Sequence, residues 1–185
     1  MIGKLVQAAV LVTAGLAISG FSGCTPRTAT PVKKPAAPDY AAPSPPSPPA
    51  AANRATCYSD ADLAVMHARM LHQELTVATL QCQNASGGRA YEDSYRSFLT
   101  KFTPELSANG RALNEIARRK RLNVDVVVTE FANRTAQKAP VDKEFCSRSL
   151  RALEWALDAK ATSLEMVPPP YDLGPDMNMH PCAAK

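Results

Sequence analysis

The chain has 185 residues, with 21 lysines and arginines against 17 aspartates and glutamates, so its formal net charge is +4. The positive excess lies before residue 55, because residues 55–185 contain 16 basic and 16 acidic side chains. A neutral body lacks the basic surface that nucleic-acid-binding proteins use, so we expect no nucleic-acid partner. Residues 55–185 have the length of one domain with a single hydrophobic core.

The first 23 residues have the pattern of a secretion signal. Lys4 precedes an apolar run from residue 5 to residue 18, which is shorter than the roughly 20 residues that cross a bilayer. Small residues then lead to Cys24. The sequence Phe21-Ser22-Gly23-Cys24 resembles the lipobox of bacterial lipoproteins, although that family prefers Leu where this chain has Phe21. An ordinary cleaved signal and an uncleaved anchor are the alternatives.

The lipobox resemblance implies that residues 1–23 are a signal peptide and that Cys24 carries lipid. The chain would then be attached to a membrane of the bacterial cell envelope through its N-terminal lipid, with its body in the periplasm. Thr25 follows the cysteine, whereas Asp at that position resembles a signal for retention in the inner membrane. We therefore expect the outer membrane rather than the inner one.

Residues 24–54 read as a tether between the lipid and the body. The segment is rich in Pro, Ala, Ser and Thr and has few large apolar side chains, so a packed structure is not expected. Proline favours an extended chain, which would reach on the order of 90 Å if the whole segment were extended. A docking motif within Pro43–Pro49 is the alternative. The prolines are Pro26, Pro31, Pro35, Pro38, Pro43, Pro45, Pro46, Pro48 and Pro49.

Two helices are predicted in the first half of the body. From Ser59 to Cys82 the apolar residues recur at three- and four-residue steps, and Ser59 or Asp60 can cap the helix. A second apolar stripe runs from Tyr91 to Ile116 and keeps its phase across Pro104. This pattern favours one long kinked helix that ends in a run of basic residues, with two shorter helices as the alternative.

The second half of the body predicts two more helices. The segment from Val124 to Gln137 has strand-forming valines, but a helical face fits it and no partner strand is evident, so a helix is favoured. Pro140 is expected to open the next helix, which would run to about Leu164 before an irregular tail from Pro168. The predicted fold of residues 55–185 is all-α, an antiparallel bundle of about four helices.

The cysteines after Cys24 predict two disulfides, since their number is even and an exported protein meets an oxidising compartment. The first helix would be about 35 Å long, which places Cys57 and Cys82 at opposite ends and prevents their pairing. The second helix would run back from the Cys82 end and the third would return to it, so the fourth helix would begin near Cys82. We therefore predict the bonds Cys82–Cys146 and Cys57–Cys182.

The sequence offers no constellation that predicts catalysis, so we expect a protein that is not an enzyme and has no catalytic residues. His67 and His72 are five residues apart, whereas histidines that bind metal on a helix are better placed four apart. The cysteines lack the close pairs of zinc sites. No metal site and no cofactor are expected.

Two features could serve binding. Trp155 lies off the inner stripe of its helix, where it would either contact a partner protein or pack under the tail at Pro168–Pro170. The Met66–Met70 pair and the aromatic stripe from Tyr91 to Phe102 could line a ligand cavity, although such spacing is more often that of a core.

A set of residues spread over the body carries a further resemblance. They are Leu71-His-Gln-Glu-Leu-Thr-Val-Ala-Thr-Leu-Gln-Cys82, Tyr91, Phe98, Thr129-Glu-Phe-Ala-Asn-Arg-Thr135 and Phe145-Cys146. In these residues the body is similar to uncharacterised helical envelope proteins of alphaproteobacteria. The similarity covers roughly residues 57–150, brings no activity with it, and includes the cysteines that we expect to pair as Cys82–Cys146. We expect a lipid-anchored module with a structural or protein-interaction role and another envelope protein as its partner. A periplasmic binding or sensor module for a small apolar ligand is the alternative.

Overall fold

The computed structural model describes residues 38–43 and 57–183. The expected signal peptide and Cys24 lie outside these residues, as do residues 25–37 and 44–56 of the expected tether. The described residues form four α-helices: α1 (Asp60–Gln81), α2 (Glu92–Lys120), α3 (Val124–Lys138) and α4 (Phe145–Leu157). The short elements β1 (Cys57–Tyr58), η1 (Leu164–Met166), η2 (Pro175–Met177) and β2 (His180–Pro181) complete them. The predicted all-α fold is confirmed.

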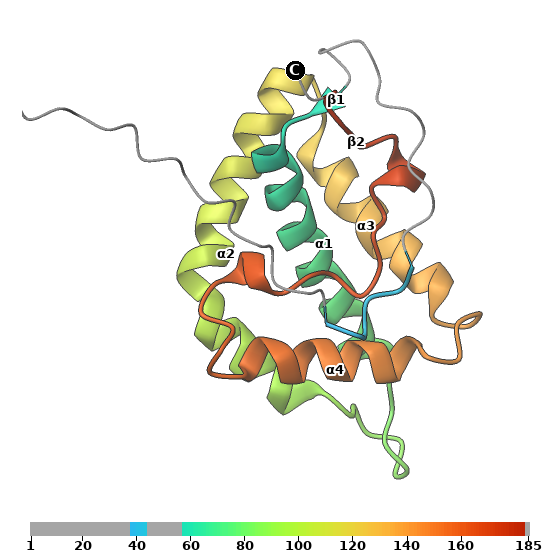
Figure 1. The fold of residues 1–185 in the computed structure, drawn as a ribbon. Helices are drawn as coiled ribbons and strands as arrows, with labels where there is room; N and C mark the ends of the chain where they lie inside the picture. The colour runs from blue at the N-terminus through green and yellow to red at the C-terminus, as the bar shows by residue number, and fades with distance from the viewer. Residues whose placement is uncertain (1–37, 44–56, 184–185) are drawn as a thin grey trace, which may run out of the picture. The chain divides into compact units, whose positions relative to one another are not determined.

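Helix α1 is the central element of the bundle (Figure 1). It lies between α2 and α3, and it packs against all three other helices. Helix α4 crosses the bundle near the end of α1 that leads to Cys82, and the chain after α4 returns along α1 to β2. There β2 pairs with β1 in parallel, with Cys57 opposite His180.

The helix starts follow from local sequence. Ser59 forms a capping box with Asp62: its hydroxyl accepts a hydrogen bond from Asp62 N at 3.1 Å, and Asp62 Oδ2 accepts one from Ser59 N at 3.4 Å. Asn123 caps α3 by accepting bonds from the N–H groups of Asp125 and Val126. This cap, with buried side chains at helical spacing behind it, explains why the valine-rich segment is a helix and not a strand.

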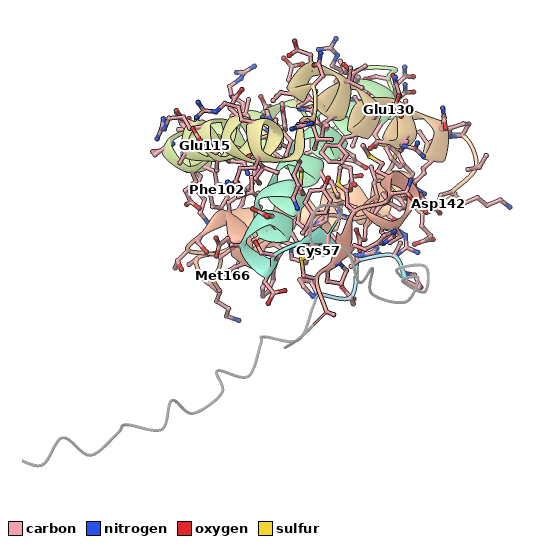
Figure 2. The ribbon with its side chains drawn as sticks, turned by 90° about the horizontal axis from the view of Figure 1, so that it is seen from above. Cys57, Phe102, Glu115, Glu130, Asp142 and Met166 are labelled. Atoms are coloured by element: carbon pink, nitrogen blue, oxygen red, sulfur yellow. A yellow bond between two sulfur atoms is a disulfide. The ribbon has the colours of Figure 1, made fainter. Side chains whose placement is uncertain are left out.

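Helix α2 continues through Pro104 as one helix, as predicted. It ends at Arg121, which has the left-handed backbone conformation common after helices, with φ of 56°. Acidic side chains on α2 and α3 pair with arginines one turn further along the same helix, as Glu115 does with Arg118 and Glu130 with Arg134 (Figure 2). Such exposed pairs within one helix contribute little to stability.

Helix α4 is shorter at both ends than the sequence predicted. It begins at Phe145 rather than Pro140, because Asp142 accepts bonds from Glu144 N at its side chain and from Phe145 N at its carbonyl, which forms a turn. It ends at Leu157 rather than near Leu164, since Asp158 is extended and its side chain accepts a bond from Lys160 N. The tail therefore begins earlier than expected.

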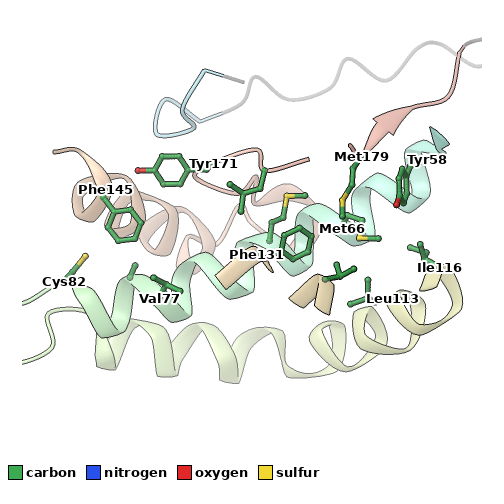
Figure 3. Packing of buried hydrophobic residues seen from close by; sticks show 14 residues of the cluster. Tyr58, Met66, Val77, Cys82, Leu113, Ile116, Phe131, Phe145, Tyr171 and Met179 are labelled. Atoms are coloured by element: carbon green, nitrogen blue, oxygen red, sulfur yellow. The ribbon is translucent and has the colours of Figure 1, made fainter. Parts of the chain in front are cut away.

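The core consists of two clusters that share α1. The first contains Met66 and Met70 with side chains of α2, α3 and the tail, such as Tyr171 and Met179 (Figure 3). The second joins the other side of α1 to α2, α4 and residues 161–167, and its largest members include Phe98 and Phe102. Since most of the tail's apolar side chains are buried, the tail is a structural layer of the fold.

Both predicted disulfides are present. The Cα atoms of Cys57 and Cys182 are 4.8 Å apart, and those of Cys82 and Cys146 are 5.7 Å apart. The pairing is as expected, but the chain takes another route: α4 lies across the bundle, and the tail covers the distance back to Cys57. The first bond joins the two ends of residues 57–182, and the second fixes the start of α4 to the end of α1.

Residues 38–43 pack on the helical body, although the sequence assigned them to the tether. Tyr40 is only 1% exposed and belongs to the second core cluster. The composition of residues 24–54 predicted no packing because most of its side chains are small, charged or proline, and Tyr40 is its single aromatic residue. Burial of one aromatic ring is enough to offset the entropy cost of ordering the few residues around it.

Candidate functional site

A cavity of about 420 Å³ opens beside the tail at the C-terminal end of α3. Four segments meet there: residues 42–43, the end of α3, the turn before α4 and the tail from residue 171 to 176. Their lining side chains are mostly polar or charged. The lining residues are Ala42, Pro43, Lys138, Val141, Asp142, Tyr171, Asp172 and Asp176.

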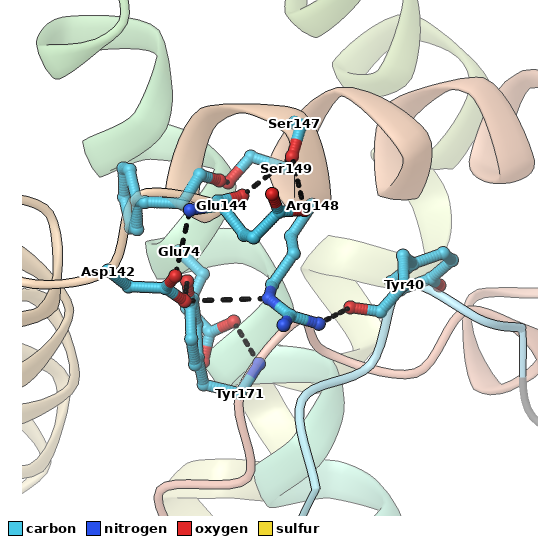
Figure 4. A network of polar contacts seen from close by, with 9 residues as sticks. Tyr40, Glu74, Asp142, Glu144, Ser147, Arg148, Ser149 and Tyr171 are labelled. Carbon is cyan, nitrogen blue, oxygen red and sulfur yellow. Dashed lines mark hydrogen bonds and ion pairs between the residues drawn. The ribbon is translucent and has the colours of Figure 1, made fainter.

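Two lining residues, Tyr171 and Asp142, form a polar group with Arg148, which does not itself line the cavity (Figure 4). The Tyr171 hydroxyl donates to Asp142 Oδ2 at 2.6 Å, and Arg148 Nε lies 3.4 Å from the same oxygen. The Tyr171 bond is the main cause that lowers the pKa of Asp142, with help from Glu144 N and Arg148. Burial and the Asp142 charge raise the pKa of Tyr171. The group is thus held as a phenol, a carboxylate and a guanidinium.

Glu74 lies beneath this group in the apolar face of α1 and is fully buried. Its Oε2 accepts a hydrogen bond from Tyr171 N at 3.0 Å, while Oε1 has no hydrogen-bond partner among the described residues. Burial raises the pKa of this carboxyl well above its usual value, more than the Tyr171 bond and the Lys138 charge lower it. The protonated form is therefore favoured, as expected for an acid without a cation in contact.

Each carboxylate that lines the cavity has a basic side chain nearby. Asp176 lies 3.9 Å from Lys138 Nζ, and Asp172 lies 3.5 Å from His67 Nε2. The Lys138 ammonium also lies 5.5 Å from the centre of the Tyr171 ring. These contacts join the tail to α1, α3 and the turn before α4, so the charges of the cavity hold the fold together.

The two histidines of α1 have different surroundings. His67 contacts Asp172 at the edge of the cavity, while His72 is mostly buried at the α1–α2 interface. The His72 ring stacks on Tyr95 with 6.4 Å between centroids, and its Nδ1 lies 3.3 Å from Arg69 Nη1. Within residues 38–43 and 57–183, no three His, Cys, Asp or Glu side chains are grouped so that they could hold a metal ion.

Trp155 does not line the cavity and lies about two turns further along α4 than Arg148. Its ring packs against the second core cluster, and its indole N–H donates to Met166 O at 2.9 Å. It therefore packs under the tail, though at residues 164–167 rather than at Pro168–Pro170. The positions assigned to an apolar ligand are likewise packed: Met66, Met70 and Phe98 have no exposed surface and Phe102 is 1% exposed.

Sequence reasoning missed Tyr40, Glu74, Arg148 and Tyr171. One signal was available for Glu74, which stands four residues after Met70 and four before Ala78, in the middle of an apolar stripe. A carboxyl group at such a position is either neutral or paired. Tyr40 could have been noticed as the lone aromatic residue of the tether, whereas nothing local marks Arg148 or Tyr171.

Comparison with known proteins brings no relatives to bear on this site. No protein-family model matches the chain, and no curated protein or solved structure matches it significantly. Among the helices of the described residues, none is both long and apolar enough to cross a membrane. The function therefore has to be argued from the residues themselves.

Replacement of Glu74 by Gln is expected to stabilise the protein at neutral and alkaline pH. The folded-state pKa of Glu74 is raised above its unfolded value near 4.5, so its contribution to stability is present below that pH and is lost as pH rises. Gln keeps the acceptor for Tyr171 N and does not ionise. We expect a gain of about 1–2 kcal/mol in urea unfolding at pH 8 and a smaller gain at pH 5.

The control for this experiment is Glu115→Gln, which changes an exposed glutamate of α2. That variant should differ little from the parent at either pH. A Glu74→Gln protein that is less stable than the parent at pH 8, or whose free energy of unfolding changes equally at both pH values, would contradict the interpretation that Glu74 is a buried acid held in its neutral form.

His72 predicts the opposite pH dependence. Burial, with a smaller contribution from the Arg69 charge, lowers the pKa of His72 to about 4. A histidine whose folded pKa is below its unfolded value near 6.5 stabilises the fold above that pH, and this stability is lost as pH falls towards 4. Through this group the parent should lose about 2 kcal/mol of its free energy of unfolding between pH 7 and pH 5. His72→Phe, which keeps a ring against Tyr95, should not show that loss. His67→Gln should leave that loss in place, and equal pH profiles for His72→Phe and the parent would refute the interpretation.

Proposed function

We propose that this chain is a lipid-anchored helical module of the bacterial cell envelope, with its body facing the periplasm and a structural or protein-interaction role. The observation that carries the proposal is the state of the cysteines. Cys57, Cys82, Cys146 and Cys182 pair with one another, which leaves Cys24 as the fifth and odd cysteine of the sequence. Disulfides persist in exported proteins, and Cys24 ends the segment that resembles a lipobox.

The proposed role is not catalytic, and the cavity supports this view. Its carboxylates contact basic side chains that belong to the fold, and its tyrosine is held as a phenol by burial and by Asp142. Groups used in this way are poorly available to a substrate. A partner protein is the better candidate, and large exposed apolar side chains give it places to bind: Leu80 on α1, Val126 on α3 and Val141 beside the cavity.

Lipidation is tested with a clickable fatty acid supplied to growing cells. The parent should incorporate the label and sediment with membranes, and density separation should place it with the outer membrane. Cys24→Ala should lose the label, because the thiol that accepts the lipid is gone. The double variant Cys57→Ala/Cys182→Ala is the matched control, since it removes two other cysteines and should keep the label. A labelled Cys24→Ala protein would exclude the proposed anchor.

Partner contact is tested by photo-crosslinking in intact cells. A photoreactive residue at Val141 should capture a discrete envelope protein, because this apolar side chain is 78% exposed at the rim of the cavity. The same probe at Thr100, an exposed polar position of α2, is the control for random capture. Adducts of equal pattern and intensity at Val141, Val126, Leu80 and Thr100 would argue against a specific interaction surface.

A further inference from the structure

Residues 38–43 bind the helical body through one aromatic ring and three hydrogen bonds. The Tyr40 ring is buried in the second core cluster. Its hydroxyl donates to Pro168 O at 2.9 Å, and its carbonyl accepts a bond from Arg148 Nη1 at 3.0 Å. Ala42 N donates to Pro170 O at 2.8 Å. The segment is thus held like a bound peptide, by its backbone and one anchor side chain.

The tail presents backbone carbonyls that accept hydrogen bonds from residues 38–43. Pro168, Pro169 and Pro170 have no backbone N–H, so this stretch accepts hydrogen bonds but donates none. Pro169 and Pro170 are buried, and the carbonyls of Pro168 and Pro170 receive their donors from Tyr40 and Ala42. Without residues 38–43 these two acceptors would lose the partners that the structure shows.

Arg148 supplies the remaining recognition. Asp142 holds the guanidinium through Nε, and the Nη1 group beyond it donates to the Tyr40 carbonyl (Figure 4). A bond to a backbone carbonyl selects no side chain, so the selectivity rests on the tyrosine ring and its hydroxyl. The neighbours Pro38, Ala41 and Pro43 are small or rigid, which keeps the ordering entropy of the segment low.

We propose that Arg148, Pro168 and Pro170, with the core cluster behind them, form an exchangeable docking site for a peptide segment that carries one tyrosine in a turn between small residues and prolines. Residues 38–43 are its ligand in the same chain. The cis segment is joined to the body through residues 44–56, which gives an effective concentration in the millimolar range. A separate peptide must therefore compete with the cis segment, and it binds well only when the cis segment has lost its place in the site. This proposal does not depend on lipidation of Cys24.

The test uses the full chain with both disulfides formed and a fluorescent peptide of residues 36–45. The parent should bind the peptide at least tenfold more weakly than Tyr40→Ala, in which the cis ligand lacks its anchor. We expect a dissociation constant for Tyr40→Ala between about 10 and 100 μM by fluorescence anisotropy, since a short peptide must offset its own ordering and must still bind well below the cis effective concentration. A peptide with Ala in place of the tyrosine should not bind, and one with Phe should bind several-fold more weakly because it cannot reach Pro168 O.

Circular dichroism and non-reducing peptide mapping establish that each variant is folded. If Tyr40→Ala does not fold, Tyr40→Phe decides the matter, because it removes only the hydroxyl and should show peptide binding between those of the parent and an empty site. Equal peptide affinity for the parent and the folded variants, or no binding to either variant at 1 mM peptide, would overturn the proposal. Tyr40 would then be a fixed part of the core and not an exchangeable ligand.

Discussion

The hydrogen bond from Tyr171 N to the buried carboxyl of Glu74 fixes the tail against the central helix, and much of the structure depends on that position. After α4 the chain contains no further α-helix among the described residues, yet it contributes buried side chains to both core clusters, Leu164 and Val167 to one and Leu173 and Met179 to the other. A segment with so few bonds of its own needs partners elsewhere. It finds them in Glu105, which accepts from Leu164 N, and in Tyr58, which accepts from Cys182 N.

Local rules were sufficient to predict the helices, because each is marked by an apolar period and two of them by a capping residue. Ser59 and Asn123 both act as expected of their types. The disulfides were also predictable, since the length of α1 excludes a Cys57–Cys82 bond and the order of the helices favours Cys82–Cys146. What could not be predicted depends on contacts distant in sequence: the bond that joins Tyr40 to Pro168 spans 128 residues, and that from Tyr171 to Glu74 spans 97. The early turn at Asp142 was missed because a side-chain bond replaced the expected first helical turn.

The two unusual ionisable groups of α1 lie on different faces and reflect different solutions to burial. Glu74 faces the tail, and its neutral carboxyl accepts the hydrogen bond of the Tyr171 backbone N–H in place of a backbone carbonyl. His72 faces α2 and is packed against a tyrosine ring and beside a cation, which favours the neutral imidazole. Both groups are therefore uncharged parts of interfaces, and the ionised side chains are found at the cavity and on the surface. A body built in this way is suited to holding a shape, which agrees with the non-catalytic role that we propose.

The position of Tyr40 has a mechanical consequence. A pull on the chain from its N-terminal side reaches the Tyr40 contacts before it reaches Cys57. These contacts are non-covalent, whereas the Cys57–Cys182 bond is covalent and ties the beginning of the body to its end. A rising load would therefore break the Tyr40 contacts first, and the disulfide would then keep the tail joined to the residues that precede α1. The attachment of residues 38–43 is thus the first part of the body to yield to tension.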